Sequence, residues 1–208
     1  ILQHPVDYVR FQDKDMMIAA DKNGKVYFIS RNGTLLMKNK QPFIKGRNSR
    51  FYIHNDGKKQ YLLTTDRKGK MIFVSGNGKI DVVTLQSFSE NHYFLTGDFD
   101  LDKKNDFIFF DNGKVTVYNH FKKKIFETRL KGNPAGEPHY ASLNKNKFQV
   151  VFPDSACSHL VLLNNKGVEE LLNYPLSSPV IEVTSLFGKN SRSILVADSN
   201  TLLNYIIN

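Results

Sequence analysis

Four aspartates stand close together in one short stretch of this basic chain, GDFDLDKKNDF. Asp98, Asp100, Asp102 and Asp106 occupy positions 1, 3, 5 and 9 of a loop. Side chains at positions 1, 3 and 5, a main-chain carbonyl near position 7 and a carboxylate at position 9 can surround a calcium ion with oxygen. The carbonyl would come from Lys104. The stretch predicts a calcium site built from these five residues, and the alternative is a solvated polar turn with side-chain to backbone hydrogen bonds.

Nucleophilic catalysis has a much weaker signal. Ser155 and Cys157 in PDSACSH have His159 nearby, but the glycines of a nucleophile elbow are missing. The histidines are scattered and lack the spacing of metal ligands. We therefore interpret PDSACSH as a turn of small residues and predict no catalytic residue.

A regular repeat defines the elements that position the aspartate loop. Five short apolar runs end in aspartates spaced by 45, 45, 43 and 44 residues: Asp21, Asp66, Asp111, Asp154 and Asp198. A turn and a second apolar run follow each aspartate, which indicates a β-hairpin. Side-chain to backbone hydrogen bonds in turns explain these aspartates, so they are not catalytic candidates.

Each repeat also contains a first strand and a weaker outer strand. The predicted first strands are DYVRFQ, RFYIHN, HYFLTGD, HYASLN and VIEVTSLF. Four strands in about 44 residues are typical of a β-propeller blade. We therefore expect an all-β fold, a single β-propeller domain over residues 1–208 with about five four-stranded blades. The aspartate loop joins the first two strands of the third blade.

The two ends of the chain predict how the propeller closes. The last repeat has three predicted strands, and the opening ILQHPVDYVRFQ resembles the segment that ends the fourth repeat. We expect residues 1–4 to supply the missing strand by pairing near residues 202–206, which would remove exposed strand edges. A piece of a longer propeller is the alternative. Because neither an initiator Met nor a basic-then-apolar leader is present, we expect a mature form or an excised domain.

The aspartate loop resembles the FG-GAP repeat of integrin-type propellers. In that repeat, a D-x-D-x-D-G-x-x-D-L loop between the first two strands of a blade holds calcium. The resemblance covers one loop and its two strands, and it implies one calcium ion. Lys103 stands where the pattern has glycine, so we expect strain on the order of 1 kcal/mol at that left-handed position. The corresponding loops of the other repeats lack the full set of carboxylates.

A less specific resemblance covers most of the chain. Strand–turn–strand units such as GKVYFISRNGTLL are similar to those of quinoprotein-type propellers and of propeller regions in uncharacterised bacterial extracytoplasmic lipoproteins. This resemblance implies an extracytoplasmic location, in the periplasm or at the cell surface. Quinoprotein repeats usually carry a Trp, which this sequence lacks, so the cofactor and the dehydrogenase activity are not carried over.

The first strands begin with aromatic and charged residues. In propellers, ligands usually meet the funnel lined by the first strands and the linkers that enter them. The residues expected there are Tyr8, Arg50, Tyr52, His92, Tyr93, His139, Tyr140 and Glu182. Aromatic faces and basic groups could bind an anionic or sugar-like partner. The alternative is that the aromatic residues pack the interfaces between blades.

Composition excludes several classes of protein. The net charge of +9 comes from lysines placed mainly in turns, so we interpret it as a solubilising surface and expect no nucleic-acid partner. No run approaches the ~18 apolar residues of a membrane span. The single Cys excludes an intramolecular disulfide.

Together the patterns predict a monomeric, non-catalytic interaction or scaffold propeller that binds a protein or a glycan and is stabilised by calcium. The alternative is a carbohydrate-active enzyme that uses the funnel. A glycosidase needs two carboxylates beside the scissile bond. Asp7 and Glu182 are the carboxylates expected near the funnel. The sequence names no partner.

Overall fold

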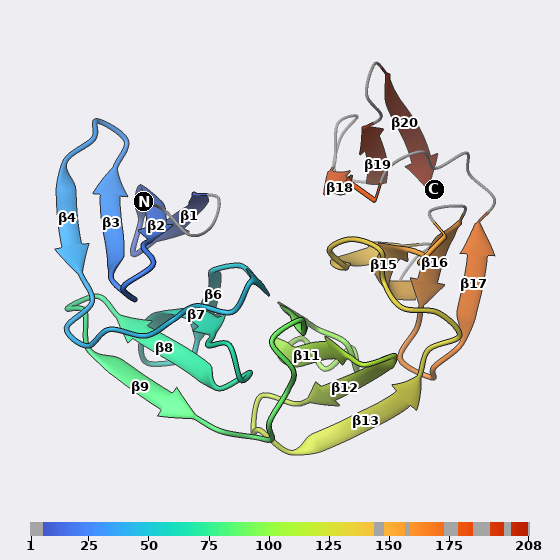
Figure 1. The fold of residues 1–208 in the computed structure, drawn as a ribbon, viewed down its shortest axis with the longest axis horizontal. Helices are drawn as coiled ribbons and strands as arrows, with labels where there is room; N and C mark the ends of the chain where they lie inside the picture. The colour runs from blue at the N-terminus through green and yellow to red at the C-terminus, as the bar shows by residue number, and fades with distance from the viewer. Residues whose placement is uncertain are drawn as a thin grey trace. The chain divides into compact units, whose positions relative to one another are not determined.

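A computed structural model describes most of the chain, namely residues 6–143, 148–156, 159–172, 179–184, 192–197 and 201–207. Every regular element in these ranges is a β-strand. The strands form five small sheets, the blades of a five-bladed β-propeller (Figure 1). The predicted all-β propeller fold is therefore confirmed.

The first two blades are four-stranded antiparallel meanders whose strands follow chain order. The first blade consists of β1 (Asp7–Phe11), β2 (Lys14–Ala20), β3 (Val26–Ser30) and β4 (Leu35–Lys38). The second consists of β6 (Tyr52–Asn55), β7 (Gln60–Thr65), β8 (Met71–Ser75) and β9 (Ile80–Val83).

The third and fourth blades have the same meander order. The third consists of β10 (Tyr93–Gly97), β11 (Asp106–Asp111), β12 (Lys114–Tyr118) and β13 (Lys124–Arg129). The fourth consists of β14 (His139–Leu143), β15 (Phe148–Pro153), β16 (Leu160–Leu163) and β17 (Glu169–Leu172).

The fifth blade has three strands in the described part of the chain: β18 (Ile181–Thr184), β19 (Arg192–Ala197) and β20 (Leu202–Ile207). The strand predicted to complete it, residues 1–4, lies outside the described residues. Closure by the N-terminal strand therefore stays a prediction.

A short strand that the sequence did not predict adds to the third sheet. β5 (Asn48–Ser49) pairs in parallel with Tyr93 and Phe94 of β10. The Asn48 side chain also donates to the Asn91 carbonyl at 3.1 Å. Two residues are too few for a periodic pattern, so this pairing depends on contacts between segments far apart in the sequence.

The repeated aspartates hold the turns between the second and third strands. The Asp21 carboxylate accepts the N–H groups of Asn23 at 2.8 Å and Lys25 at 2.9 Å. Asp66 accepts the N–H groups of Lys68 and Lys70 at 2.8 and 2.9 Å. These bonds confirm the predicted turn-forming role at these two positions. Asp198 lies outside the described residues.

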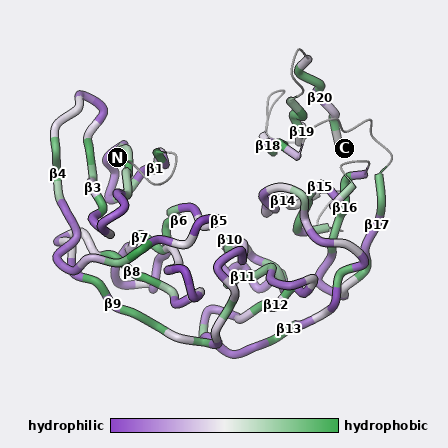
Figure 2. The backbone as a smooth tube through the Cα atoms, in the orientation of Figure 1, coloured by the Kyte–Doolittle hydropathy of each residue, from purple (hydrophilic) through white to green (hydrophobic). Residues whose placement is uncertain are grey.

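Burial follows the position of a strand in its blade. All six residues of β15 are buried, whereas the outer strand β13 alternates between exposed and half-buried residues. An inner strand is apolar on both faces because its sheet lies between neighbouring sheets. Figure 2 shows the corresponding pattern of hydropathy, with hydrophobic residues along strands and hydrophilic residues in many connections.

The chain divides into two compact units, residues 1–94 and 95–208. Each has its own apolar core, which includes Phe28 and Leu62 in the first unit and Phe148 and Leu162 in the second. The single domain over residues 1–208 stays a prediction. Within the described ranges, the protein contains no helix long and apolar enough to cross a membrane.

Candidate functional site

The loop between β10 and β11 is anchored by aromatic residues. Phe99 is almost completely buried, and its ring lies 5.2 Å from that of Phe126 on β13, measured between centroids. The Tyr140 hydroxyl of β14 donates to the Asp98 carbonyl at 2.9 Å. A Cβ atom at Gly97 would lie only 2.2 Å from the Tyr140 ring, so this close packing requires glycine. These contacts fix the entry of the loop.

Three of the four predicted carboxylates converge. One oxygen from each of Asp98, Asp100 and Asp106 lies within 4.8 Å of the others. Oxygens that bind one calcium ion at ~2.3–2.6 Å can lie no more than about 5 Å apart. The three carboxylates are therefore placed closely enough to share one ion. Because all three ligand atoms would be oxygens, the site suits a hard cation better than a soft transition metal.

The loop leaves two buried carboxylate oxygens without hydrogen-bond donors. Asp106 is completely buried, and its Oδ2 accepts the N–H groups of Phe99 at 2.9 Å and Asp100 at 3.2 Å. Asp98 Oδ2 accepts the Lys103 N–H at 3.0 Å. The other oxygen, Oδ1, of both Asp98 and Asp106 is buried and has no hydrogen-bond partner. An unsatisfied buried polar atom costs about 1–3 kcal/mol, which a bound cation would offset.

The electrostatics of Asp106 also favour a cation. Burial raises the pKa of Asp106 to about 7, and the negative charges of Asp100 and Asp102 act in the same direction. The N–H groups of Asp100 and Phe99 oppose this shift. Near neutral pH, ionisation of the buried Asp106 carboxyl group therefore lowers the stability of the folded protein. A divalent cation would stabilise the ionised form.

Asp102 lies outside the converging group and connects the loop to the β12–β13 turn. Its Oδ1 accepts the Lys104 N–H at 2.8 Å, and its Oδ2 lies 3.6 Å from His120 Nδ1. The Lys104 ammonium donates to His120 Nε2 at 3.1 Å. His120 Nε2 is therefore the acceptor nitrogen, and Nδ1–H faces Asp102. The Lys104–His120 hydrogen bond thus joins the loop to the turn, whereas His120 Nδ1 is buried and has no hydrogen-bond partner.

His120 was missed by the sequence analysis, although its position was predictable from the strand order. In an antiparallel meander, the connection between the first two strands and the connection between the last two lie at the same end of the sheet. The β12–β13 turn must therefore lie beside the β10–β11 loop. No motif marks His120, because HFKKK reads only as a polar turn.

The loop backbone is strained where the sequence lacks glycine. Lys103 has a φ of 68° and Leu101 a φ of 67°, both in the left-handed region. This region costs a residue with a side chain roughly 1–2 kcal/mol. The predicted left-handed conformation at Lys103 is confirmed, and Leu101 adds a second strained position.

Two of the predicted funnel tyrosines pack against neighbouring strands. The Tyr52 hydroxyl donates to the Phe94 carbonyl at 3.1 Å, and its ring meets the Phe94 ring edge to face. Tyr140 makes the contacts with Gly97 and Asp98 described above. Both tyrosines therefore join adjacent blades, which is the structural alternative considered for the aromatic residues.

His92 is not available as a surface binding group, which corrects the sequence prediction. Its side chain is completely buried. Nε2 lies 2.9 Å from Thr65 Oγ1, and Nδ1 lies 2.6 Å from the Ser89 carbonyl. Both ring nitrogens are therefore satisfied within the fold, because a polar group far from water needs partners there.

The remaining predicted funnel residues differ in exposure. Tyr8 is 62% exposed. Arg50 and Glu182 are also exposed, and Tyr93 and His139 are half-buried. Glu182 and His139 belong to the second unit and the other three to the first. The common funnel that they were expected to line stays a prediction.

The weak catalytic candidates have structural roles in the described residues. The His159 N–H donates to Asp154 Oδ1 at 3.1 Å, and His159 Nδ1 lies 3.3 Å from Asp154 Oδ2. Asp7 Oδ2 accepts the Phe51 N–H at 3.2 Å. Cys157 lies outside the described residues.

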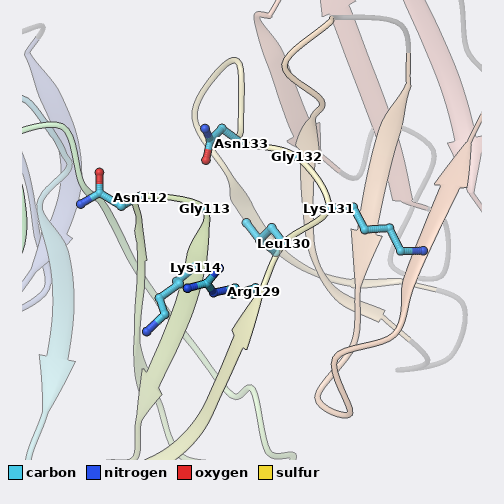
Figure 3. A pocket seen from close by; sticks show the side chains of 8 residues that line it. All are labelled: Asn112, Gly113, Lys114, Arg129, Leu130, Lys131, Gly132 and Asn133. Carbon is cyan, nitrogen blue, oxygen red and sulfur yellow. The ribbon is translucent and has the colours of Figure 1, made fainter.

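A basic hollow of about 330 Å³ lies at the other end of the third blade (Figure 3). The β11–β12 turn and the segment that follows β13 form its walls, and the lining residues are Asn112, Gly113, Lys114, Arg129, Leu130, Lys131, Gly132 and Asn133. The sequence did not predict this hollow, because the lysines in turns were interpreted only as a solubilising surface.

The comparisons with known proteins show the fold. No family model matches the chain, and no curated protein matches its sequence. Among solved structures, BBS1N in complex with ARL6DN has a TM-score of 0.67 and 10% identity, and the match covers 97% of this chain and 64% of that one. The chain thus spans less than two thirds of BBS1N.

Two further solved structures are similar. Catalytically inactive virginiamycin B lyase from Staphylococcus aureus with quinupristin has a TM-score of 0.61 and 15% identity, covering 96% of this chain and 69% of that one. BamB from Moraxella catarrhalis has a TM-score of 0.50 and 10% identity, covering 100% and 71%. At these identities the likeness is one of fold, and the chain is a β-propeller.

Proposed function

We propose that this chain is a non-catalytic β-propeller that binds another protein and is stabilised by calcium in the aspartate loop. The observation that carries the proposal is the pair of buried oxygens, Asp98 Oδ1 and Asp106 Oδ1, that have no hydrogen-bond partner. Together with Asp100 they lie in a group of carboxylates compact enough for one ion. The resemblance to FG-GAP loops supports the choice of calcium.

Calcium would act here as a cross-link within one blade. It would offset the repulsion among the three carboxylates, which is about 1 kcal/mol per close pair in water and larger near the protein interior. It would also hold the strained residues Leu101 and Lys103 in place. Kd values of 10⁻⁴–10⁻³ M are typical of extracellular calcium modules. If the loop binds calcium in this range, an extracytoplasmic location fits the proposal.

The surface beside the loop offers an anchor for a protein partner. Phe121 of the β12–β13 turn is 75% exposed, and the Lys104 ammonium lies 5.5 Å from the centre of its ring. Three lysines, at positions 122–124, follow it in the sequence. Aromatic anchors surrounded by polar residues dominate the binding energy of many protein interfaces. The partner would accept the ring in an apolar pocket and present acidic groups to the lysines.

The structural neighbours support a protein rather than a glycan as the partner. BBS1N was crystallised in complex with ARL6DN, so a propeller of this fold can hold another protein. The alternative is a carbohydrate-active enzyme that would use Glu182 and Asp7, whose Oδ2 accepts the Phe51 N–H at 3.2 Å. We expect the chain itself to be monomeric, which light scattering would test.

The calcium site is tested by calorimetric titration of the calcium-free protein. We expect binding of one ion, and a stability gain of about 2.7 kcal/mol at 100 times the Kd, measured by unfolding in urea. Magnesium should stabilise less, because it requires a tighter octahedron and keeps its waters. Asp100→Ala should abolish the calcium gain, while Asp56→Ala, in the β6–β7 turn, should keep it. No heat of binding in the wild-type protein would leave the polar-turn interpretation standing.

The partner surface is tested by capture with the full chain in calcium, followed by titration of the purified captured protein. We expect Phe121→Ser to weaken that binding at least tenfold. Val82→Ser, which removes a side chain that is 53% exposed on β9, should leave it unchanged. Equal binding by wild-type protein and Phe121→Ser would reject this surface, and binding only to glycans would reject the protein partner.

A further inference from the structure

The basic hollow lies at the end of the third blade opposite the aspartate loop. Connections in a meander alternate between the two ends of the sheet, so the β11–β12 turn lies away from the β10–β11 loop. The Leu130 N–H donates to the Gly113 carbonyl at 2.8 Å and thereby fixes the segment after β13 to this turn. The hollow is therefore walled by two connected segments.

Two cations face one another at its edge. Lys114 of β12 and Arg129 of β13 are direct partners in the strand register. Figure 3 shows the Arg129 side chain reaching toward Lys114, whereas Lys131 points the other way. Like charges directly opposite one another destabilise a pair of strands. The juxtaposition therefore gives the fold no benefit of its own.

Glu127, one of the acids beside the hollow, is shared between two lysines. Glu127 Oε1 accepts from the Lys114 ammonium at 3.0 Å, and its Oε2 accepts from the Lys124 ammonium at 3.3 Å. These two hydrogen bonds lower the pKa of Glu127. One negative charge thus serves two positive ones, and the residues that line the hollow include no acid. The lining itself therefore carries three positive charges, and the carboxylates of Asp111 and Glu169 lie just outside it, beside Asn112 and the Lys131 N–H.

Neutral carboxamides complete the lining. Asn112 and Asn133 bring these groups to the walls, and the Asn112 amide donates to Asp111 Oδ2 at 3.3 Å. Gly113 has a φ of 72°, and a Cβ there would lie 3.3 Å from the Asn133 side-chain oxygen. Glycine therefore allows the tight turn and keeps Asn133 close to it. Carboxamides donate hydrogen bonds without requiring a counter-charge, which suits them to orient an oxyanion.

We propose that this hollow binds an oxyanion group, sulfate or phosphate, carried by an organic ligand. The Arg129 guanidinium makes a planar, bidentate pair with two oxygens, and Lys114 contributes a second charge. The Asn133 carboxamide adds a neutral donor that orients the group. The site is independent of calcium, because it shares no residue with the aspartate loop.

A second hollow, in the first unit, provides a matched control. It measures about 380 Å³ and is lined by Lys58 and Lys59, but also by Asp13. The N–H groups of both lysines donate to Asp56. It therefore resembles the first hollow in size and in having basic residues, but differs in containing an acid.

The test is a titration of the full chain with inorganic sulfate, inorganic phosphate and a sulfated heparin tetrasaccharide, followed by amide NMR shifts. We expect shifts at Gly113 and Gly132. Arg129→Gln should weaken binding of the preferred probe at least tenfold, Arg129→Lys should have an intermediate effect, and Lys59→Gln should bind as the wild type does. The probe that binds with the higher affinity identifies the oxyanion as a sulfate or a phosphate.

Two outcomes would overturn the proposal. The first is an equal loss of affinity in Arg129→Gln and Lys59→Gln, because that result would show attraction by net charge alone. The second is unchanged binding in Arg129→Gln, or shifts confined to residues away from the hollow. Arg129 is exposed, so its replacement leaves the core intact and the comparison interpretable.

Discussion

The second and third blades differ in the connection between their first two strands. The aspartates of these two connections have opposite environments. In the β6–β7 turn, the exposed Asp56 accepts the N–H groups of Lys59 at 2.7 Å and Lys58 at 2.8 Å. These bonds lower its pKa. In the β10–β11 loop, burial raises the pKa of Asp106 to about 7 and leaves one oxygen without a partner.

This difference separates a turn from a candidate metal site. Both connections contain aspartate, and both contain side-chain to backbone hydrogen bonds. The β6–β7 turn satisfies its carboxylate within three residues and leaves it in water, so a cation would add little. The β10–β11 loop withdraws a carboxylate from water and places others beside it, so the charged form lacks a counterion.

Removal of Asp106 should have the largest effect. In saturating calcium, we expect Asp106→Ala to lower the free energy of unfolding by about 3–5 kcal/mol, because the N–H groups of Phe99 and Asp100 lose their buried acceptor together with the ion. Asp56→Ala should cost about 1 kcal/mol, because water replaces its exposed acceptor. Urea unfolding measures both. Equal losses would show that the two connections are alike.

The pH dependence of the calcium-free protein should reveal the same contrast. An unfolded aspartate has a pKa near 4, whereas that of Asp106 in the folded protein is about 7. The native state binds the extra proton between these values. Stability should therefore fall as pH rises through this window, by up to ~1.4 kcal/mol per pH unit for one group.

Asp106→Asn is the control for this dependence. It should remove that part of the pH dependence and make the calcium-free protein more stable than the wild type at pH 8. Asp56 should act oppositely, since its lowered pKa gives stability that is lost as pH falls below about 4. Superimposable profiles for the wild type and Asp106→Asn would contradict the burial argument.

Calcium binding should release a proton below neutral pH. Because Asp106 must ionise to bind the ion, the affinity should weaken by up to tenfold for each pH unit below about 7. Calorimetry in buffers with different ionisation heats measures the released proton directly. A calcium affinity that stays constant between pH 5 and 8 would place Asp106 outside the coordination shell.

The smallest expected effect comes from removing a single hydroxyl group between blades, and it compares a tyrosine that contacts the loop with one that does not. Tyr140→Phe removes the hydrogen bond to the Asp98 carbonyl, and Tyr52→Phe removes the matching bond to the Phe94 carbonyl. Each should cost about 1 kcal/mol of stability. Only Tyr140→Phe should also weaken calcium binding, by a few-fold in calorimetry, because Tyr140 contacts the loop and Tyr52 does not. Equal calcium affinity in both variants would remove Tyr140 from the site.

The blade architecture was predictable because it repeats. Aspartates such as Asp21 and Asp66 recur at a constant interval, and each ends an apolar run at a turn that its own carboxylate stabilises. Local patterns of this kind need no information from distant residues. The parallel pairing of β5 with β10 has no such local pattern, and it was therefore missed.

The candidate site was predictable only in part. The spacing of Asp98, Asp100 and Asp106 marked them as ligands for one ion, and the fold brings them together. The same spacing included Asp102, which instead lies beside His120. His92 was expected in the funnel because it stands at the start of a first strand, but it is buried by residues distant in sequence. Spacing defines what a loop can reach, whereas packing decides which oxygens and nitrogens stay free.

The sequence by itself determined the repeat, the strand order and the acidic loop, because these depend on residues that are neighbours in the chain. The tertiary structure decided which aspartate is buried, which oxygens lack donors and which cations face one another in the hollow. Burial depends on strands far apart in sequence, such as β13 and β14, which contribute Phe126 and Tyr140 to the anchoring of the loop. The electrostatic character of a carboxylate follows from this burial, and the residue type alone does not specify it.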